Sequence, residues 1–199
     1  MTTKPTRTAL ILTALLFTAL APARAQRVAG AAVLGSLKVG QWVKMQGVPQ
    51  PDFSINTGKI KFVTGDFQDN DWEIFGPVRA IDRQKKEFMI LNLKIKVAEA
   101  TEFKGENAGR SSNGAGSDFK SFEQLQAGML VEVEGSFLKD GTFLADNVKD
   151  NTATTDPEDA NEIECFGKIE KIDAAKRIVT MMGVTFKITE ATKLKSAVK

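Results

Sequence analysis

The chain contains the same segment twice, and this duplication limits the possible folds more than any other feature of the sequence. Residues 73–104 align without a gap with residues 164–195, and 11 of the 32 aligned positions are identical. Roughly two identities would arise by chance at ordinary residue frequencies. A weaker pair aligns residues 37–60 with residues 125–148. We name the first segment A and the second B, so the chain reads B, A, B, A.

Both segments have the pattern of half-buried strands. Residues 93–97 (LKIKV) alternate apolar and charged side chains, which is the period of a strand with one buried face. Asn92 and Gly183 occupy equivalent positions between two apolar runs, and both residue types fit a tight hairpin turn. Residues 139–142 (KDGT) predict another hairpin. Bulges or sharp bends are predicted at the glycines inside strand patterns, Gly47, Gly76, Gly135 and Gly167.

The order of these elements predicts an all-β fold. Residues 72–150, read as A then B, give three strands, one short helical turn within residues 121–128, and two further strands. This is the strand order of an OB barrel. The sequence therefore predicts two small OB-like β-barrels built from an internal repeat, with little helix.

Four short motifs carry a family resemblance. They are residues 76–82 (GPVRAID), 121–128 (SFEQLQAG), 131–135 (VEVEG) and 140–148 (DGTFLADNV). With them the chain resembles a bacterial family of exported proteins that carry a repeated OB-like domain of unknown function. The resemblance covers the central unit well and the terminal half-units in part. It implies the fold and supplies no catalytic residues.

Two arrangements of the half-units are open. In the first, residues 72–150 form a central barrel, and residues 27–71 plus 162–199 complete a second barrel. In the second, residues 27–105 and 121–199 are separate domains joined by the Gly/Ser-rich stretch before Ser121, an insert that departs from the family pattern. The linker composition favours the second arrangement. The family resemblance favours the first, which we take as the working prediction.

The first 25 residues have the features of a secretory signal peptide. Lys4 and Arg7 precede an apolar run from Ala9 to Ala21, and cleavage is predicted after Ala25. The apolar run is too short for a permanent membrane helix, and no later segment is apolar enough to cross a membrane. The mature chain is therefore predicted to be periplasmic or secreted, without a membrane span.

Charge and composition exclude several classes of function. Removing the signal peptide lowers the number of basic residues from 27 to 24, against 25 acidic residues, so global charge gives no support to a nucleic-acid partner. The chain has no histidine and a single cysteine, which excludes Ser-His-Asp and Cys-His sites and an internal disulfide. No P-loop, GxGxxG, HExxH or GxSxG motif is present. We predict that the chain is not an enzyme.

One candidate site lies on the expected ligand face of the central barrel. OB barrels bind ligands across their second and third strands and the adjoining loops. Basic side chains beside an aromatic ring can hold an anionic glycan or single-stranded nucleic acid, while the alternative is an ordinary solvated strand face. The candidate ligand-binding residues are Lys85, Lys86, Lys94, Lys96 and Phe137.

A second candidate site is acidic. Asp66, Asp69 and Asp71 precede the first A segment, and acidic residues between positions 156 and 164 precede the second. Oxygen-rich loops suit calcium, although the spacing does not match an EF-hand. The alternative is a solvated acidic loop. We predict no cofactor, and calcium is the one ion that these loops leave as an alternative.

Replacements within the repeat favour packing roles for three notable residues. Trp42 aligns with Leu130, Trp72 with Ile163, and Cys165 with Ile74. A position that accepts an aliphatic side chain in the other copy is expected to be buried, so Cys165 is predicted to be an inert, packed thiol.

The sequence as a whole predicts a non-catalytic, exported binding or structural module of unknown ligand. An envelope glycan or another envelope protein is the expected kind of partner. Two alternatives stay open: a carboxylate- or metal-dependent hydrolase of an envelope polymer, and a calcium-stabilised adhesion or assembly module.

Overall fold

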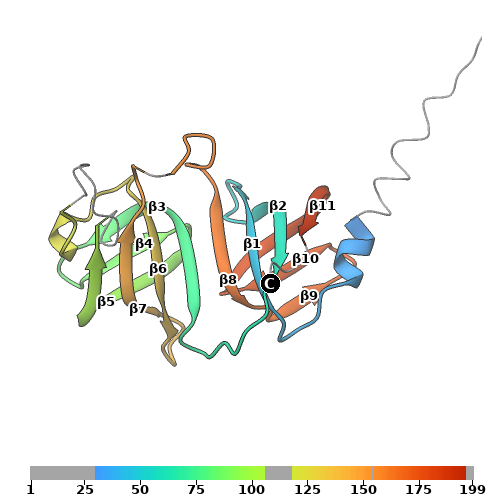
Figure 1. Cartoon of the computed structure of the whole chain (residues 1–199), viewed down its shortest axis with the longest axis horizontal. Helices are drawn as coiled ribbons and strands as arrows, with labels where there is room; N and C mark the ends of the chain where they lie inside the picture. Colours follow the sequence, from blue (N-terminus) through green and yellow to red (C-terminus); the bar gives the residue numbers. More distant parts are fainter. Residues whose placement is uncertain (1–29, 106–117, 154, 196–199) are drawn as a thin grey trace, which may run out of the picture.

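The computed structural model describes residues 30–105, 118–153 and 155–195. Within these residues, eleven strands form one continuous hydrogen-bonded sheet that curls upon itself (Figure 1). Their buried apolar side chains form one connected core. The prediction of an all-β fold with little helix is confirmed.

Five of the strands close into a barrel. They are hydrogen-bonded in the order β4-β5-β7-β6-β3, and β3 also pairs with β4, which completes the ring. The β5–β7 pair is parallel and the other pairs are antiparallel. The five strands are β3 (Trp72–Asp82), β4 (Glu87–Ile90), β5 (Leu93–Lys104), β6 (Leu130–Phe137) and β7 (Phe143–Asp150).

The other six strands extend the sheet in the order β8-β1-β2-β11-β10-β9. β1 pairs with β8, and β2 pairs in parallel with β11, so strands from the two ends of the chain lie side by side (Figure 1). Closure of these strands into a second barrel stays a prediction. The six strands are β1 (Trp42–Pro49), β2 (Ile55–Phe62), β8 (Ile163–Lys168), β9 (Lys171–Asp173), β10 (Ile178–Met181) and β11 (Val184–Lys195).

The two sets of strands meet where β3 pairs antiparallel with β8. The ladder contains Glu73 opposite Phe166, Ile74 opposite Cys165, and Phe75 opposite Glu164. Ile74 and Cys165 are both fully buried, as their equivalence in the alignment predicts. We call this β3–β8 ladder, with the side chains that pack on it, the seam.

Glycines inside the strands serve two different purposes. Gly47 and Gly135 lie at register shifts, as predicted for bulges, and a Cβ there would come within 2.1 and 2.0 Å of a backbone oxygen on the neighbouring strand. At Gly76 and Gly167 no register shift is present. A Cβ at these two positions would instead meet Ile163 and Trp72 across the seam. The prediction of bulges is therefore wrong for the second pair, which permits close packing of the two sets of strands.

Both A segments contain a Glu-Ala-Thr run, at residues 99–101 and 190–192, and the contacts of its threonine explain the repetition. Thr101 Oγ1 donates to the carbonyl of Ala145 at 2.7 Å and accepts from the backbone N–H of Ala98 at 2.9 Å. Thr192 does the same at 2.7 and 2.9 Å with Thr57 and Thr189. Each hydroxyl lies where the register of a parallel strand pair is interrupted, and it bonds to both strands.

Two short helical segments accompany the strands. Phe122–Gln124 form a 3₁₀ turn within the predicted residues 121–128, and the Gln124 side chain accepts from the backbone N–H of Ser121 at 3.1 Å, as in a capping box. Residues 30–35 are helical, which the sequence pattern did not indicate. The side chains of Val33, Leu34 and Leu37 are buried there.

Candidate ligand-binding cleft

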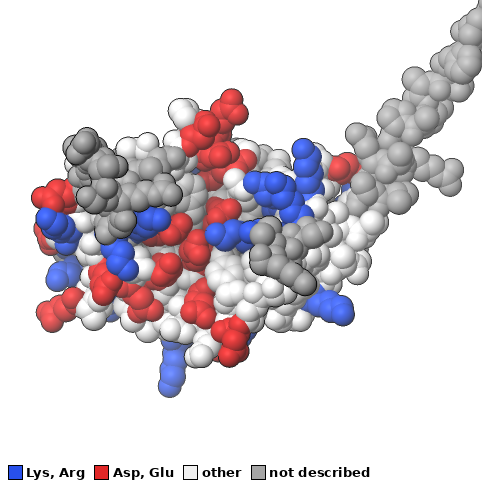
Figure 2. Space-filling model, viewed as in Figure 1, with Lys and Arg blue, Asp and Glu red and all other residues white. Residues whose placement is uncertain are grey.

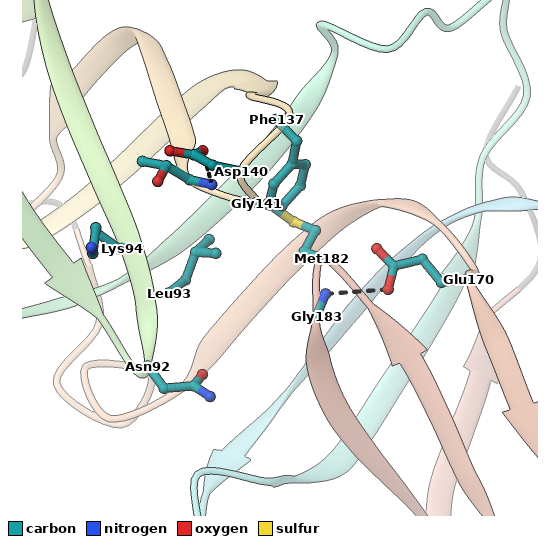
Figure 3. Close-up of a pocket in the computed structure, with 10 residues that line it drawn as sticks. Asn92, Leu93, Lys94, Phe137, Asp140, Gly141, Glu170, Met182 and Gly183 are labelled. Atoms are coloured by element: carbon teal, nitrogen blue, oxygen red, sulfur yellow. Dashed lines mark hydrogen bonds between the residues drawn. The ribbon is translucent and has the colours of Figure 1, made fainter.

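A cleft of about 470 Å³ opens between the two sets of strands (Figure 3). Its walls are the β4–β5 turn, the β6–β7 hairpin, the β10–β11 turn and the residue that precedes β9. The β4–β5 and β10–β11 turns are equivalent in the repeat alignment, so both halves of the duplication contribute. The lining residues are Asn92, Leu93, Lys94, Phe137, Asp140, Gly141, Thr142, Glu170, Met182 and Gly183.

The β4–β5 and β10–β11 turns are tight, as predicted. The residues that adopt the left-handed backbone conformation in them differ in part from those expected. Leu91 has φ of 55° and Met182 has φ of 56°, followed by Gly183 at 67°. The sequence pattern assigned this role to Asn92, which is not in the left-handed region. Leu91 and Met182 are also almost fully buried, at 2 % and 1 % exposure. Their burial holds both turns in place at the cleft.

The charged groups of the cleft come from both sets of strands. Asp140 accepts a hydrogen bond from the backbone N–H of Thr142 at 2.9 Å, and this bond lowers the pKa of the carboxyl. Lys94, on β5, adds a weaker electrostatic stabilisation of the same carboxylate. Across the cleft, Glu170 accepts from the backbone N–H of Gly183 at 3.3 Å (Figure 3). The cleft therefore offers one ammonium and two carboxylates.

Phe137 is the aromatic wall of the cleft. Its ring packs edge-on against Trp72, with centroids 5.6 Å apart, and against Phe143, at 5.1 Å. Figure 3 shows the Met182 side chain directed toward Phe137 from the opposite strands. Because Phe143 is fully buried and Trp72 is 8 % exposed, the ring is held by the core rather than by solvent-exposed neighbours.

A second hollow, of about 590 Å³, shares Phe137 with the cleft. It lies between the segment that leads into β3 and the ends of β6 and β8. Lys168 bonds to Asp69 there at 2.5 Å and also lies over the Trp42 ring, 5.5 Å from its centroid. The lining residues are Gln68, Asp69, Asn70, Ser136, Phe137 and Lys168.

The structure brings together part of the predicted basic site. Lys94 and Phe137 both line the cleft. Lys85 and Lys94 line a separate hollow of about 260 Å³ beside β4, where Lys85 pairs with Asp82 at 3.2 Å. Lys86 has φ of 52°, and its carbonyl accepts from the N–H of Val97, so it is a turn residue.

Lys96 faces Glu87 across the β4–β5 ladder. It lines none of the three hollows described here. Two of the five predicted residues thus belong to the cleft, one lies beside it, and two lie elsewhere on the barrel.

The predicted calcium residues do not converge. Asp69 pairs with Lys168, and Asp71 accepts from the backbone N–H of Gln68 at 2.7 Å. Among the described residues, no three His, Cys, Asp or Glu side chains are grouped so that they could hold a metal ion. Calcium binding by Asp66, Asp69 and Asp71 stays a prediction without support from their geometry.

The packing predictions for the tryptophans agree with their surroundings. Trp42 contacts Trp72, Phe67 and Phe166, with ring centroids between 5.1 and 5.4 Å apart. Trp72 is buried beside Gly167. Burial of Cys165 raises the pKa of its thiol, which disfavours the reactive thiolate.

The outward face of the seam is acidic. Figure 2 shows acidic side chains gathered over the middle of the molecule, where β6, β3 and β8 lie side by side. Lys44 bonds there to Glu73 at 3.1 Å and to Glu164 at 2.8 Å. Burial would lower the pKa of Lys44, but hydrogen bonds and the charges of both carboxylates outweigh it and raise that pKa to about 12. Burial raises the pKa of Glu73 despite the opposing effect of Lys44.

Several cleft residues carried no recognisable signal in the sequence. Glu170 aligns with Arg79, and Thr142 and Asp140 read only as a hairpin turn. Met182 and Gly183 lie in a predicted hairpin turn, but the sequence does not indicate that this turn lines a cleft. The duplication contained one usable hint, because equivalent turns of two packed copies can meet at the contact between them.

No helix in the described part of the chain is long and apolar enough to cross a membrane.

Comparison with known proteins identifies one family. Residues 75–149 match the family described as a domain of unknown function (DUF5666). The match begins within β3 and ends within β7, so it coincides with the closed five-stranded barrel. Neither the curated proteins nor the solved structures contain a match to the chain.

Proposed function

We propose that this chain, which carries a DUF5666 domain, is an exported, non-catalytic binding module whose ligand occupies the cleft. The observation that carries the proposal is that turns from both repeat halves line one cleft. The buried Leu91 and Met182 fix those turns, so the cleft is preformed. Preformed concave sites with an aromatic wall and a few polar groups are typical of ligand-binding proteins.

The architecture that we propose for this module is a pair of OB-like barrels. In the closed barrel, Gly128 N donates to Val78 O at 2.8 Å, and Val78 N donates to Met129 O at 2.9 Å. The aligned positions of the other strands have the same bonds: Gly40 N donates to Ile169 O at 2.8 Å, and Ile169 N donates to Gln41 O at 2.9 Å. These bonds join Ile169, the residue that follows β8, to the segment before β1, and β9 then pairs with β10 as β3 pairs with β4 in the closed barrel.

The cleft supports binding better than acid–base catalysis. A general acid needs a carboxyl whose pKa is raised toward neutrality. The Thr142 N–H lowers the pKa of Asp140 instead. The hydrolase alternative keeps one supporting observation, which is that Asp140 and Glu170 both line the cleft. Release of reducing ends from envelope glycans, abolished by Asp140→Asn or Glu170→Gln, would establish it.

Export follows from the predicted signal peptide, which lies outside the described residues. Expression of the full chain in a bacterial host should give a periplasmic or secreted protein that begins at Gln26. Intact-mass measurement of the purified protein checks this cleavage. Full-length precursor retained in the membrane fraction would contradict it.

The proposed partner is an envelope glycan or another envelope protein. The test is an NMR titration of the isotope-labelled mature protein with soluble envelope glycan fragments and with purified envelope proteins. We expect amide shift changes at the cleft, around Asn92 and Gly183. Asn92→Trp, which fills the cleft, should abolish them, whereas Gln84→Trp on the exposed β3–β4 turn should not. Shift changes confined to other surfaces would overturn the proposal.

A further inference from the structure

We propose that the ligand is an uncharged oligosaccharide that runs from the cleft past Phe137 into the second hollow. The inference rests on the proposed function and adds to it a ligand class and a direction. Three features support it: the two hollows share Phe137, their charges are nearly balanced, and three of their carboxamides are unengaged.

The two hollows share one lining residue, Phe137, and Ser136, the preceding residue, also lines the second. Their volumes of about 470 and 590 Å³ each fall within the usual range for a small-molecule site. A ligand that used both would therefore be elongated, with Phe137 at its middle.

The charges of these hollows do not favour a charged ligand. Lys168 is paired with Asp69 at 2.5 Å, and Lys94 lies in the field of the Asp140 carboxylate. Glu170 adds a further negative charge beside the cleft. A polyanion would meet three carboxylates, and a polycation would meet two ammonium groups. A neutral ligand avoids both penalties.

Three neutral carboxamides of this surface are unengaged. The side chains of Gln68, Asn70 and Asn92 are exposed and make no hydrogen bond to another described residue. Each carboxamide offers two donor hydrogens and an acceptor oxygen. Sugar hydroxyls also donate and accept, so they match such groups. The Phe137 ring, held edge-on by Trp72 and Phe143, supplies a rigid apolar surface for the C–H face of a sugar.

The two ends of this path can be tested separately. Binding of chitotetraose and cellotetraose, both uncharged, and of tetragalacturonate, an anion, would be measured by calorimetry and NMR on the mature protein. We expect an uncharged tetrasaccharide to bind best. Asn92→Ala in the cleft and Asn70→Ala in the second hollow should each weaken binding about tenfold. Asn56→Ala, an exposed asparagine on β2, is the matched control and should change it less than about twofold.

Each other outcome overturns a defined part of the proposal. If the protein binds tetragalacturonate best, with shift changes at the cleft, the ligand is not an uncharged oligosaccharide. The proposed binding function would still stand. A loss with Asn92→Ala but none with Asn70→Ala overturns the extension past Phe137. Absence of cleft shift changes with all three sugars overturns this inference, while cleft binding of an envelope protein in the titration described above would still support the proposed function.

Discussion

Ile74 lies directly opposite Cys165, its own equivalent in the repeat, in the antiparallel ladder between β3 and β8. Two equivalent strands that pair about equivalent residues are related by a local twofold axis. The side chains follow the same symmetry. Gly76 lies under Ile163, and its equivalent Gly167 lies under Trp72, which is the equivalent of Ile163. The seam is therefore a contact between corresponding surfaces of the two halves.

The first prediction concerns the glycines of the seam. A Cβ at Gly76 would lie 2.5 Å from Ile163 Cδ1, and one at Gly167 would lie 2.3 Å from Trp72 Cε3. We expect Gly76→Ala and Gly167→Ala each to lower the free energy of unfolding by about 1–3 kcal/mol through overpacking. Urea denaturation measures this loss.

A glycine outside the seam, Gly58 on β2, and a double variant provide the controls. At Gly58 a Cβ would come no nearer than 3.8 Å to its closest neighbour, so Gly58→Ala should be nearly neutral. Ile163→Val removes the Cδ1 that Gly76→Ala would strike. The double variant should therefore lose less stability than the sum of the single changes. Strict additivity would show that the clash is not the cause.

The second prediction concerns pH and Lys44. The three side chains of the Lys44, Glu73 and Glu164 group are 18–28 % exposed, so solvent screens them only in part. Lys44→Met should lower stability at pH 7.5 by about 2 kcal/mol, because two facing carboxylates lose their shared cation. Burial already raises the pKa of Glu73, and without the opposing effect of Lys44 this pKa rises further above its unfolded value. The penalty should then be present at neutral pH and disappear as pH falls through the carboxyl range.

Thermal melting between pH 7.5 and pH 4 checks this sign. The difference in Tm between wild type and Lys44→Met should shrink toward pH 4 as Glu73, whose pKa is raised by burial, becomes protonated. At high pH the wild-type contribution of Lys44 should be lost as pH rises through about 12, its raised pKa. A Tm difference that does not vary between pH 7.5 and 4 would contradict the electrostatic explanation. Lys85→Met, at an exposed pair, is the control.

The third prediction contrasts two buried threonines. Thr57 Oγ1 is buried and has no hydrogen-bond partner among the described residues, and the aligned position in the closed barrel is Ala145. Thr57→Val removes this unsatisfied group at nearly constant shape and should raise stability by about 1 kcal/mol. Thr101→Val makes the same change where the hydroxyl has two bonds, and should cost about 1–3 kcal/mol. Equal effects of the two substitutions would refute the contrast.

The strands and turns could be predicted because their signals are local. Alternation along residues 93–97 and the Asp-Gly pair at Asp140 and Gly141 depend on neighbours in the sequence, and both agree with the structure. The glycines show where local reasoning ends. Gly135 and Gly76 look alike in sequence, but one forms a bulge and the other lies under a side chain nearly 90 residues away.

The cleft was only partly predictable for the same reason. Lys94 and Phe137 were found because a ligand face could be assigned within one barrel. Glu170 and Met182 were missed because the other half of the chain brings them to that face. Lys86 lies in a left-handed turn and does not line the cleft, and the sequence does not distinguish such a lysine from one that faces a ligand.

The last prediction separates the two domain arrangements considered from the sequence. A specific protease site inserted between residues 105 and 118 would divide the chain into two fragments. β3 and β5 would lie in the first fragment, and their partners β6 and β7 would lie in the second. β1 and β8 would also be separated.

We expect the cut protein to elute as one species in size exclusion and to separate only in denaturant, because the intact barrel needs strands from both fragments. Two folded fragments that separate without denaturant would instead establish independent domains on either side of the Gly/Ser-rich stretch. The unmodified protein, which lacks the inserted site, is the control for the protease treatment itself.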